Sequence, residues 1–435
     1  MTIVRRQLSK ETPAFLWLLL FSLFAKIIFV IAINNKMPVF GDALDYINAA
    51  ISLVKHREYP EVGSMPFFRA PFYPIYISVF YVISPKYYLF LLRLSQVFLS
   101  VLTGILIYKV AENFFSKKIA SITACIFLFH PFFNLMLIEV QTETLFLLLN
   151  GLALFCTLGV ADDNHKLIKI IFVGLFGGMA VLTRPAFGIF FPLVLIWFGI
   201  LNRKRPFLFI RDLLILLFSL TLVVGPWVYR NFIRYGEFIY CNDAGGLAFY
   251  LYNSKEYLQY LTAEDPATYK KLTNEIIFDK WKRQIESFER SDNYSKLTPK
   301  KRERLWYQAA FDYVKGNKIE WAGLLVLKAI DYLRLYIHPY AYGYKLAATS
   351  FFLTGIFLLL GTAGIVLSLN QHINRGKVLF ILAYFLASIF AHVLYLSSVR
   401  YRIVFIDVWL YMFSVYFVSF MVQHIINIWK VRNGS

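Results

Sequence analysis

Long apolar runs separated by short polar segments dominate the chain. An α-helix needs about 20 apolar residues to cross a bilayer. Ten runs approach or reach that length, at 14–33, 89–110, 119–137, 145–160, 168–182, 187–201, 213–229, 346–369, 378–396 and 403–423. The pattern therefore predicts an all-α polytopic membrane protein, a bundle of about ten transmembrane helices.

Two other apolar segments do not fit the pattern of a transmembrane helix. Residues 72–83 are short and follow Pro71, so we expect them to lie flat on the membrane surface. Residues 321–336 are interrupted by charged side chains and predict an interfacial helix. Between the transmembrane runs lie two long polar segments, predicted to be external juxtamembrane helices and a helical external domain. The predicted divisions are 1–229, a transmembrane module with a first external loop at 34–88; 230–345, the external helical domain; and 346–435, the last transmembrane helices.

Charge supports a membrane topology rather than a nucleic-acid partner. The chain is 59% hydrophobic and carries a formal net charge of +19. Its basic residues gather at alternate ends of the apolar runs, at 117–118, 203–205, 370–377 and in the tail from Lys430. By the positive-inside rule, both termini are cytoplasmic and loops 34–88 and 230–345 face outward. The first run has no evident cleavage site, so we expect an uncleaved span in the plasma (inner) membrane.

Familiar soluble-enzyme motifs are missing from the sequence. The three cysteines have neither metal-site spacing nor a disulfide framework. No P-loop, dinucleotide-binding glycine motif or zinc-protease motif is present. The candidate chemistry must therefore come from charged residues at the external ends of the spans.

Carboxylates follow the first span and interrupt a later one. Asp42, Asp45 and Tyr46 form one turn of a predicted helix, where Asp42 could be a helix N-cap or a general base that accepts a proton from an alcohol. Glu139 and Glu143 lie between two apolar runs, where a carboxylate is costly. Glu143 could be a site residue, or the ion-pair partner of Arg93 or Arg184.

Basic residues collect at the same predicted face. Arg400-Tyr401-Arg402 places two guanidinium groups on one short loop, where they could anchor the chain or grip a lipid phosphate bidentately. Other cations have similar alternatives between a ligand contact and a structural or surface role. They are Arg69 before Pro71, Arg93, Arg184 before Pro185, Arg230 before the long loop, and His338 before Pro339.

The order of these motifs resembles a known family. An external Asp-x-x-x-Tyr helix is followed by Arg69 and prolines, Thr142-Glu143, Thr183-Arg184-Pro185, Pro226-Trp227-x-x-Arg230-Asn231 and the late Arg400-Tyr401-Arg402. This order is similar to that of GT-C integral-membrane glycosyltransferases of family 39, the group related to protein O-mannosyltransferases and lipid A aminoarabinose transferases. The similarity covers roughly residues 41–231, and 400–402 separately.

The resemblance implies a function and roles. It implies a polyprenyl-phosphate sugar donor, an external active site and inversion at the anomeric carbon, with Asp42 as general base beside Tyr46. Glu143 stands where many members have Asp. Ala43 follows Asp42 where members commonly have a second acid, so we expect no essential metal or cofactor, at most a non-essential divalent cation.

The working hypothesis is an enzyme that transfers a sugar from this donor to a glycan, lipid or protein hydroxyl. Asp42 and Glu143 are the catalytic candidates, and Arg93, Arg184, Arg400 and Arg402 the candidates for the donor phosphate. Asp45, Tyr46, Arg69, Glu139, Arg230 and His338 would line the cavity. The alternatives are a flippase or transporter of lipid-linked glycans, which would favour internal repeats, and a glycan polymerase or ligase.

Overall fold

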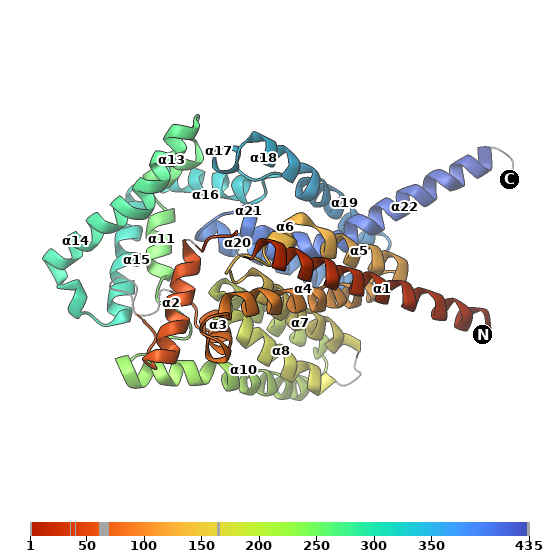
Figure 1. Cartoon of the computed structure of the whole chain (residues 1–435), viewed down its shortest axis with the longest axis horizontal. Coiled ribbons are helices and arrows are strands. Elements are labelled where there is room, and N and C mark those ends of the chain that lie inside the picture. The colour runs from red at the N-terminus through yellow and green to blue at the C-terminus, as the bar shows by residue number, and fades with distance from the viewer. Residues whose placement is uncertain (1, 35, 40, 61–68, 163–165, 433–435) are drawn as a thin grey trace.

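The computed structural model describes residues 2–34, 36–39, 41–60, 69–162 and 166–432. All regular secondary structure in these ranges is helical, which confirms the predicted all-α class. The helices form an elongated bundle with a second helical layer at one end (Figure 1). The start of α1 and the end of α22 both project at the opposite end, well apart from each other (Figure 1).

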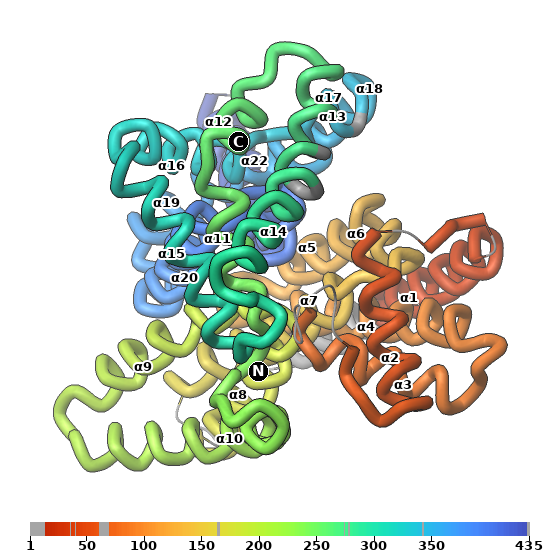
Figure 2. Tube along the Cα trace, turned by 90° about the vertical axis from the view of Figure 1, so that its left-hand side faces the viewer, coloured from red at the N-terminus to blue at the C-terminus, as the bar shows by residue number. Residues whose placement is uncertain are grey.

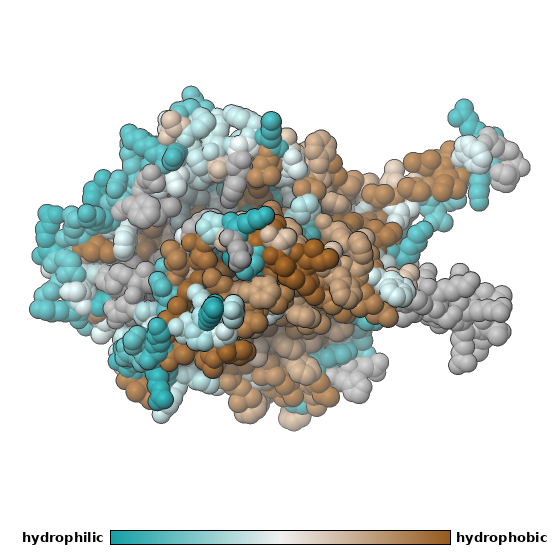
Figure 3. Space-filling model, viewed as in Figure 1, coloured by the Kyte–Doolittle hydropathy of each residue, from teal (hydrophilic) through white to brown (hydrophobic). Residues whose placement is uncertain are grey.

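Eight helical segments of the described ranges are long and apolar enough to cross a membrane. Their outer side chains form a broad hydrophobic surface, whereas hydrophilic side chains cover the left-hand end (Figure 3). The segments are α1 (Thr2–Ile33, apolar from Ala14), α4 (Tyr88–Glu112), α7 (Glu143–Gly159) with the turn Val160–Asp162, α8 (Lys166–Thr183), α10 (Pro206–Tyr235), α18 (Tyr344–Ser350) running into α19 (Ile356–Asn370), α20 (Arg375–Leu394), and α21 (Val399–Arg402) running into α22 (Val408–Arg432).

Two of the ten predicted spans are shorter than expected. The predicted span 119–137 is broken into α5 (Lys117–Phe129) and α6 (Pro131–Leu135), because Pro131 starts a new helix whose Phe132 N–H is capped by His130 Nδ1 at 3.2 Å. The predicted span 187–201 becomes a 3₁₀ turn, Pro185–Ile189, followed by α9 (Phe190–Leu201). In the described ranges, eight of the ten predicted runs are helices of spanning length, and the other two are the broken run at 117–135 and the shorter apolar segment Pro185–Leu201.

The first loop carries two short helices. Helix α2 (Asp42–Lys55) packs on α3 (Phe72–Ile83), which also packs on α4. In Figure 1, α3 is seen nearly end-on while α1 and α4 run across the view, so α3 lies across the bundle axis. Its buried face holds Tyr73 and Ile77, and Val79 and Val82 on the other face are 51% and 66% exposed. This geometry agrees with the expected position on a membrane surface.

The polar segment after α10 folds into a helical layer with its own core. Trp306 and Tyr294 are fully buried there, and the indole N–H donates to the Tyr294 hydroxyl at 2.8 Å. Figure 2 shows this layer in green and cyan across the end of the bundle. Its helices are α11 (Gly245–Tyr252), α12 (Lys255–Leu261), α13 (Pro266–Asn274), α14 (Trp281–Asp292), α15 (Pro299–Gly316) and α16 (Lys318–Tyr332), and α17 (Pro339–Tyr342) leads back to α18.

Close packing fixes the last helices. Gly361 and Gly364 of α19 face the backbone of α22, and a Cβ on Gly361 would lie 2.9 Å from Leu410 Cβ and 3.0 Å from its carbonyl oxygen. A Cβ on Gly364 would collide with the carbonyl of Phe413. The two helices therefore touch along their backbones, which holds α21 in a defined place at the head of α22.

Candidate active site

A cavity of about 650 Å³ lies between the bundle and the helical layer that covers it. The loop after α1, helices α4 and α6 and residues 138–141 form one side, and α12, α13 and α16–α18 form the other. Four predicted site residues line this cavity, namely Arg93, Glu139, His338 and Arg400. The structure therefore brings together side chains that lie more than 300 positions apart in the sequence.

Arg69 holds two carboxylates at the start of α2. Its Nη2 donates to Asp42 Oδ1 at 2.6 Å and to Asp45 Oδ2 at 2.8 Å, and its Nε donates to Asp45 at 3.1 Å. Gly41, with φ of +58°, is the N-cap of α2, so Asp42 is the first helical residue and not the cap. These two acids and Tyr46 give the pKa of Arg69 a net upward shift against the opposing effect of its burial.

Glu143 is the centre of a second charged cluster. It is fully buried at the start of α7. Its Oε1 forms an ion pair with Arg184 Nη2 at 2.8 Å and accepts a hydrogen bond from Arg400 Nε. Arg184 also donates to Thr142 Oγ1 at 2.8 Å, and Arg400 to Gln141 Oε1 at 2.8 Å. Within the described part of the chain, Glu143 Oε2 is buried without a hydrogen-bond partner. The expected alternative of an ion pair with Arg184 is thus observed, but it includes Arg400 as well.

Tyr46 connects the two clusters. Its ring lies under the Arg69 guanidinium, 5.4 Å from centroid to Cζ. Burial raises the pKa of Tyr46 to about 12, with Arg69 and Arg184 opposing the shift and Asp42 and Glu143 adding to it. Both carboxylates therefore lie within electrostatic reach of this one phenol. None of Asp42, Tyr46 and Glu143 lines the cavity itself, whereas the nearby Ala43 and Gln141 do.

Arg93 reaches the cavity from α4 with its own set of acceptors. Its Nε donates to the carbonyl of Ile138 at 2.9 Å, its Nη1 to Asn34 Oδ1 at 2.9 Å and its Nη2 to the carbonyl of Met37 at 3.3 Å. These neutral contacts tie the loop after α1 to the segment before Glu139. Unlike Arg400, this arginine has no ion pair with a carboxylate among the described residues.

Four of the six predicted arginines do not line the cavity: Arg69 and Arg184 lie in the two charged clusters, and Arg230 and Arg402 lie apart from them. Arg402 is fully buried, forms a two-pronged pair with Asp407 at 2.9–3.1 Å and donates to the carbonyl of Tyr332 at 3.2 Å. Arg230 stacks on Trp227, 5.1 Å from the ring centroid, and bonds to Asn231. Neither residue lines the cavity. The structure does not bring them to the site where Arg93 and Arg400 meet.

Glu139 and His338 line the cavity, and burial shifts the pKa of both side chains. Loss of hydration raises the pKa of Glu139, and Glu143 raises it further while Arg400 opposes the shift. Loss of hydration and the nearby Arg334 together lower the pKa of His338 to about 4. His338 Nδ1 accepts the backbone N–H of Tyr340 at 3.2 Å, and its ring is neutral near pH 7.

Sequence reasoning missed part of the cavity wall. Asp331 and Arg334 line it and form an ion pair at 2.8 Å, and Gln141 lines it next to Arg400. Tyr257, Tyr260 and Tyr269 also line it. The signal available for the charged pair was its i,i+3 spacing at the end of an apolar helix, which was interpreted only as a membrane-surface feature.

A metal site is not evident in the described ranges. No group of three or more histidine, cysteine, aspartate or glutamate side chains lies close enough together there to hold an ion. Asp42 and Asp45 instead share the guanidinium of Arg69, which offsets one of their two negative charges. The expectation of no essential metal stays a prediction.

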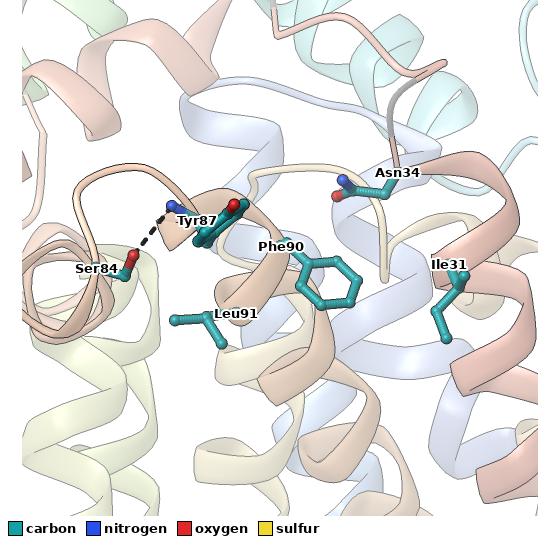
Figure 4. Close-up of a pocket in the computed structure, with 6 residues that line it drawn as sticks. All are labelled: Ile31, Asn34, Ser84, Tyr87, Phe90 and Leu91. Atoms are coloured by element: carbon teal, nitrogen blue, oxygen red, sulfur yellow. Dashed lines mark hydrogen bonds between the residues drawn. The ribbon is translucent and has the colours of Figure 1, made fainter.

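A second hollow of about 550 Å³ lies beside the site. It is lined by Ile31 and Asn34 from the end of α1, Ser84 before α4, and Tyr87, Phe90 and Leu91. Figure 4 shows Ile31 and Phe90 on neighbouring helices, with Asn34 above them. Asn34 is also the acceptor for Arg93, so this apolar hollow adjoins the charged cavity.

The fold and cavity define the class. A bundle of helices long enough to span a membrane, covered at one end by a helical layer, is the GT-C fold of the solved structures named below. The resemblance expected from sequence is confirmed for residues 68–229, which match the family described as dolichyl-phosphate-mannose-protein mannosyltransferase. No curated protein sequence matches the chain.

Solved structures of the archaeal enzyme AglB show the same fold. The archaeal oligosaccharyltransferase AglB from Archaeoglobus fulgidus, in complex with an inhibitory peptide and a dolichol-phosphate, aligns with a TM-score of 0.55 and 15% identity, over 98% of this chain and 52% of that one. The same protein tethered to an acceptor peptide aligns with a TM-score of 0.55 and 15% identity, over 94% and 50%. ArnT from Cupriavidus metallidurans, bound to undecaprenyl phosphate, aligns with a TM-score of 0.43 and 14% identity, over 93% and 77%. The chain spans about half the length of AglB.

Proposed function

We propose that the protein is a glycosyltransferase that moves a sugar from a polyprenyl-phosphate donor to an acceptor hydroxyl at the external face of the plasma membrane, with inversion. The observation that carries this proposal is the cavity itself, in which Arg93, Arg400 and Glu139 meet between membrane spans and a polar layer. The family match over residues 68–229 supports it. The GT-C fold of AglB, solved with a dolichol-phosphate, agrees with it.

The donor would place its phosphate near Arg400. This guanidinium is 34% exposed, and its pairs with Glu143 and Gln141 fix its orientation. Arg93 lines the same cavity, and Arg184 lies behind Arg400 on Glu143. Leu135 and Leu346 line the cavity and are 47% and 51% exposed, which suits entry of an isoprenoid chain from the bilayer. Guanidinium groups would stabilise the phosphate as it leaves.

Asp42 would act as the general base. Its side chain is 45% exposed, and Arg69 fixes its Oδ1. The carboxylate accepts the proton of the acceptor hydroxyl while that oxygen forms its bond to the anomeric carbon. The bond from this carbon to the phosphate oxygen breaks, and the lipid phosphate departs with the electron pair. Asp42 then returns the proton to water, and the attack from the opposite side inverts the anomeric centre.

Glu143 would position the other groups. Its Oε1 is occupied by Arg184 and Arg400, and its Oε2 is buried without a partner in the described part of the chain. A buried charged oxygen in this state is costly and usually has a functional reason. Because Glu143 is fully buried and does not line the cavity, that reason would be to fix Arg184 and Arg400 rather than to contact the acceptor.

The test is a reconstituted transfer assay with several labelled polyprenyl-phosphate sugars. Loss of a general base lowers turnover by about 10²–10⁴-fold, which we expect for Asp42→Asn. The matched control is Asp45→Asn, since Asp45 shares the same Arg69 contact one helical turn away. Unchanged turnover in the Asp42 variant, with the control equally active, would remove Asp42 as the base.

The external position of the site has its own test. Single cysteines at Ser291, exposed in the helical layer, and at Ser116, exposed in the loop before α5, are introduced after replacement of Cys125, Cys156 and Cys241. A membrane-impermeant thiol reagent added to intact cells should label position 291 and not 116. The reverse pattern would invert the proposed topology.

A further inference from the structure

One carboxylate on the cavity wall has no partner in the described part of the chain. Glu139 lies between α6 and α7, lines the cavity and is exposed. Its carboxylate forms no hydrogen bond or ion pair with a described residue, and only its backbone carbonyl is bonded, to Gln96 Nε2 at 3.2 Å. The other acid on this wall, Asp331, pairs with Arg334 at 2.8 Å and accepts a bond from Ser397 at 3.0 Å. Glu139 is therefore the acid that is free to bind a ligand.

The backbone around Glu139 is held firmly by α4. Gln96 Nε2 also donates to the carbonyl of Leu137 at 2.9 Å, and Arg93 Nε donates to that of Ile138 at 2.9 Å. Both Gln96 and Arg93 are buried. The three successive carbonyls of residues 137 to 139 are thus fixed, while the carboxylate stays available. A rigid backbone beneath a free polar side chain favours a ligand contact, because little ordering remains to be done on binding.

Gln141 adds a hydrogen-bond donor two positions later. It also lines the cavity, and its Oε1 accepts a bond from Arg400 Nη2 at 2.8 Å. This bond uses the amide oxygen, and no described residue accepts a hydrogen bond from the Nε2 group. The segment therefore offers a carboxylate that accepts hydrogen bonds and an amide that donates them, next to a guanidinium group.

Sugar hydroxyls match these two groups. A hydroxyl both donates and accepts, so one can donate to the Glu139 carboxylate while its neighbour accepts from Gln141 Nε2. A lipid phosphate alone would bring negative charge near Glu139 and no donor for its carboxylate. Arg400 acts on the pKa of Glu139, so the two side chains lie within electrostatic reach of each other. A sugar attached to a phosphate at Arg400 would therefore place its hydroxyls beside Glu139.

We propose that Glu139, assisted by Gln141, binds hydroxyl groups of the sugar that the donor carries, while Arg400 holds its phosphate. The proposal rests on the proposed function and deepens it, since it names the residues that distinguish a sugar-bearing lipid phosphate from the bare one. After transfer, the departing lipid phosphate has lost these hydroxyls and gained negative charge beside the carboxylate. Glu139 thus favours exchange of the product for a new donor.

The test measures two affinities of the full-length protein in lipid nanodiscs. One is for short-chain polyprenyl phosphates that carry glucose, mannose or N-acetylglucosamine, and the other is for the same polyprenyl phosphate without a sugar. All titrations contain a chelator, so that no metal ion bridges Glu139 and a phosphate. Glu139→Ala should weaken binding of the preferred sugar-bearing ligand roughly 10- to 100-fold, through loss of a charge-assisted hydrogen bond. Affinity for the bare phosphate should stay the same or rise, because a nearby negative charge is removed.

Two controls separate ligand binding from folding. Glu58→Ala removes a carboxylate after α2 that pairs with Arg234 and does not line the cavity, so both affinities should stay at the wild-type values. The second control changes the ligand, with analogues of the preferred sugar that each lack one hydroxyl. One analogue should bind the wild type as weakly as the complete sugar binds Glu139→Ala. The variant should not distinguish that analogue from the complete sugar, because the two losses concern the same hydrogen bond.

Each outcome decides the assignment. A loss that is confined to the sugar-bearing ligand, and that disappears with one deoxygenated analogue, supports it. An equal loss for the bare phosphate, or no loss at all, overturns it. If the wild type binds the sugar-bearing and bare phosphates equally, the assignment is overturned while the lipid-phosphate part of the proposed function stands. If the wild type binds none of these ligands, the proposed donor is wrong and the role of Glu139 fails with it.

Discussion

Arg400 and Arg402 lie two positions apart in α21 and point into opposite environments. Arg400 is 34% exposed, lines the cavity and contacts Glu143, whereas Arg402 is fully buried and paired with Asp407. Ser398 caps this short helix by accepting the N–H of Arg400 at 3.3 Å. One turn of helix therefore carries a cavity residue and a structural residue with the same chemistry.

Arg402→Gln should destabilise the fold without a direct effect on donor affinity. The substitution leaves Asp407 as an unpaired carboxylate that is fully buried, and breaking a buried pair costs about 3–5 kcal/mol. We expect a lower thermal unfolding temperature in detergent. The double variant Arg402→Met with Asp407→Leu should recover much of the loss, and a single variant as stable as the wild type would contradict the structural role.

Arg400→Gln should weaken donor binding and have little effect on the stability of the fold. It removes one charge-assisted contact to a phosphate, worth about 1.5–3 kcal/mol, so the donor KM should rise by roughly 10- to 150-fold. The affinity for polyprenyl phosphate in a titration is the measurement, with Lys377→Gln as a control at a partly buried cation that lies outside the cavity. A large fall in unfolding temperature with unchanged affinity would show that Arg400, like Arg402, has a structural role.

Much of the fold followed from the spacing of apolar runs. The predicted surface helix at 72–83 coincides with α3, and the predicted first span ends at Ile33, as observed. The break at His130 was not predicted, although Pro131 was visible, because apolar residues continue on both sides of it. Periodicity reports burial, but it does not report where a continuous apolar run stops being one helix.

The site was harder to predict because the charge of a residue does not show in which direction its side chain points. Arg400 and Arg402 are equivalent in sequence, and only Asp407, five residues later inside an apolar run, could have marked Arg402 as paired. The Asp42–Arg69 contact followed from the expected loop, which is closed locally. The tyrosines that line the cavity are placed by helix packing in 245–345, where no sequence motif was available.

Gly364→Ala should destabilise the protein through packing alone. A Cβ there collides with the Phe413 carbonyl of α22, and overpacking a core costs about 1–3 kcal/mol. Gly323→Ala is the matched control, because no atom lies within 4 Å of its Cβ position in α16. The control should gain up to about 1 kcal/mol from helix propensity. Equal thermal unfolding temperatures for the two variants would contradict the close contact of α19 and α22.

Removal of metal ions should leave turnover unchanged. Arg69 pairs with both Asp42 and Asp45, so the carboxylates that could hold a cation already share a cationic partner. The measurement is the transfer assay before and after treatment with a chelator, followed by addition of Mg²⁺ or Mn²⁺. Activity that is lost with the chelator and restored by one of these ions would contradict the prediction.

His338 should make stability depend on pH below neutrality. Its pKa of about 4 in the folded protein lies below its ordinary value of 6.5, so the folded state favours the neutral ring. Between pH 6.5 and 4, the unfolded chain binds a proton that the folded chain does not, and stability falls as the pH falls through this window. Above pH 6.5 the ring is neutral in both states and contributes no dependence.

The comparison is between the wild type and His338→Gln. The variant cannot take up this proton, so its unfolding temperature should fall less than that of the wild type between pH 7 and pH 5. His56→Gln, at an exposed histidine after α2, is the control and should keep the wild-type dependence. The variant also loses the ring contact between His338 and Tyr269, but it loses this contact at every pH. The loss therefore changes the unfolding temperature by the same amount throughout and does not change its pH dependence. Parallel curves for wild type and His338→Gln would show that the ring is not held neutral by its surroundings.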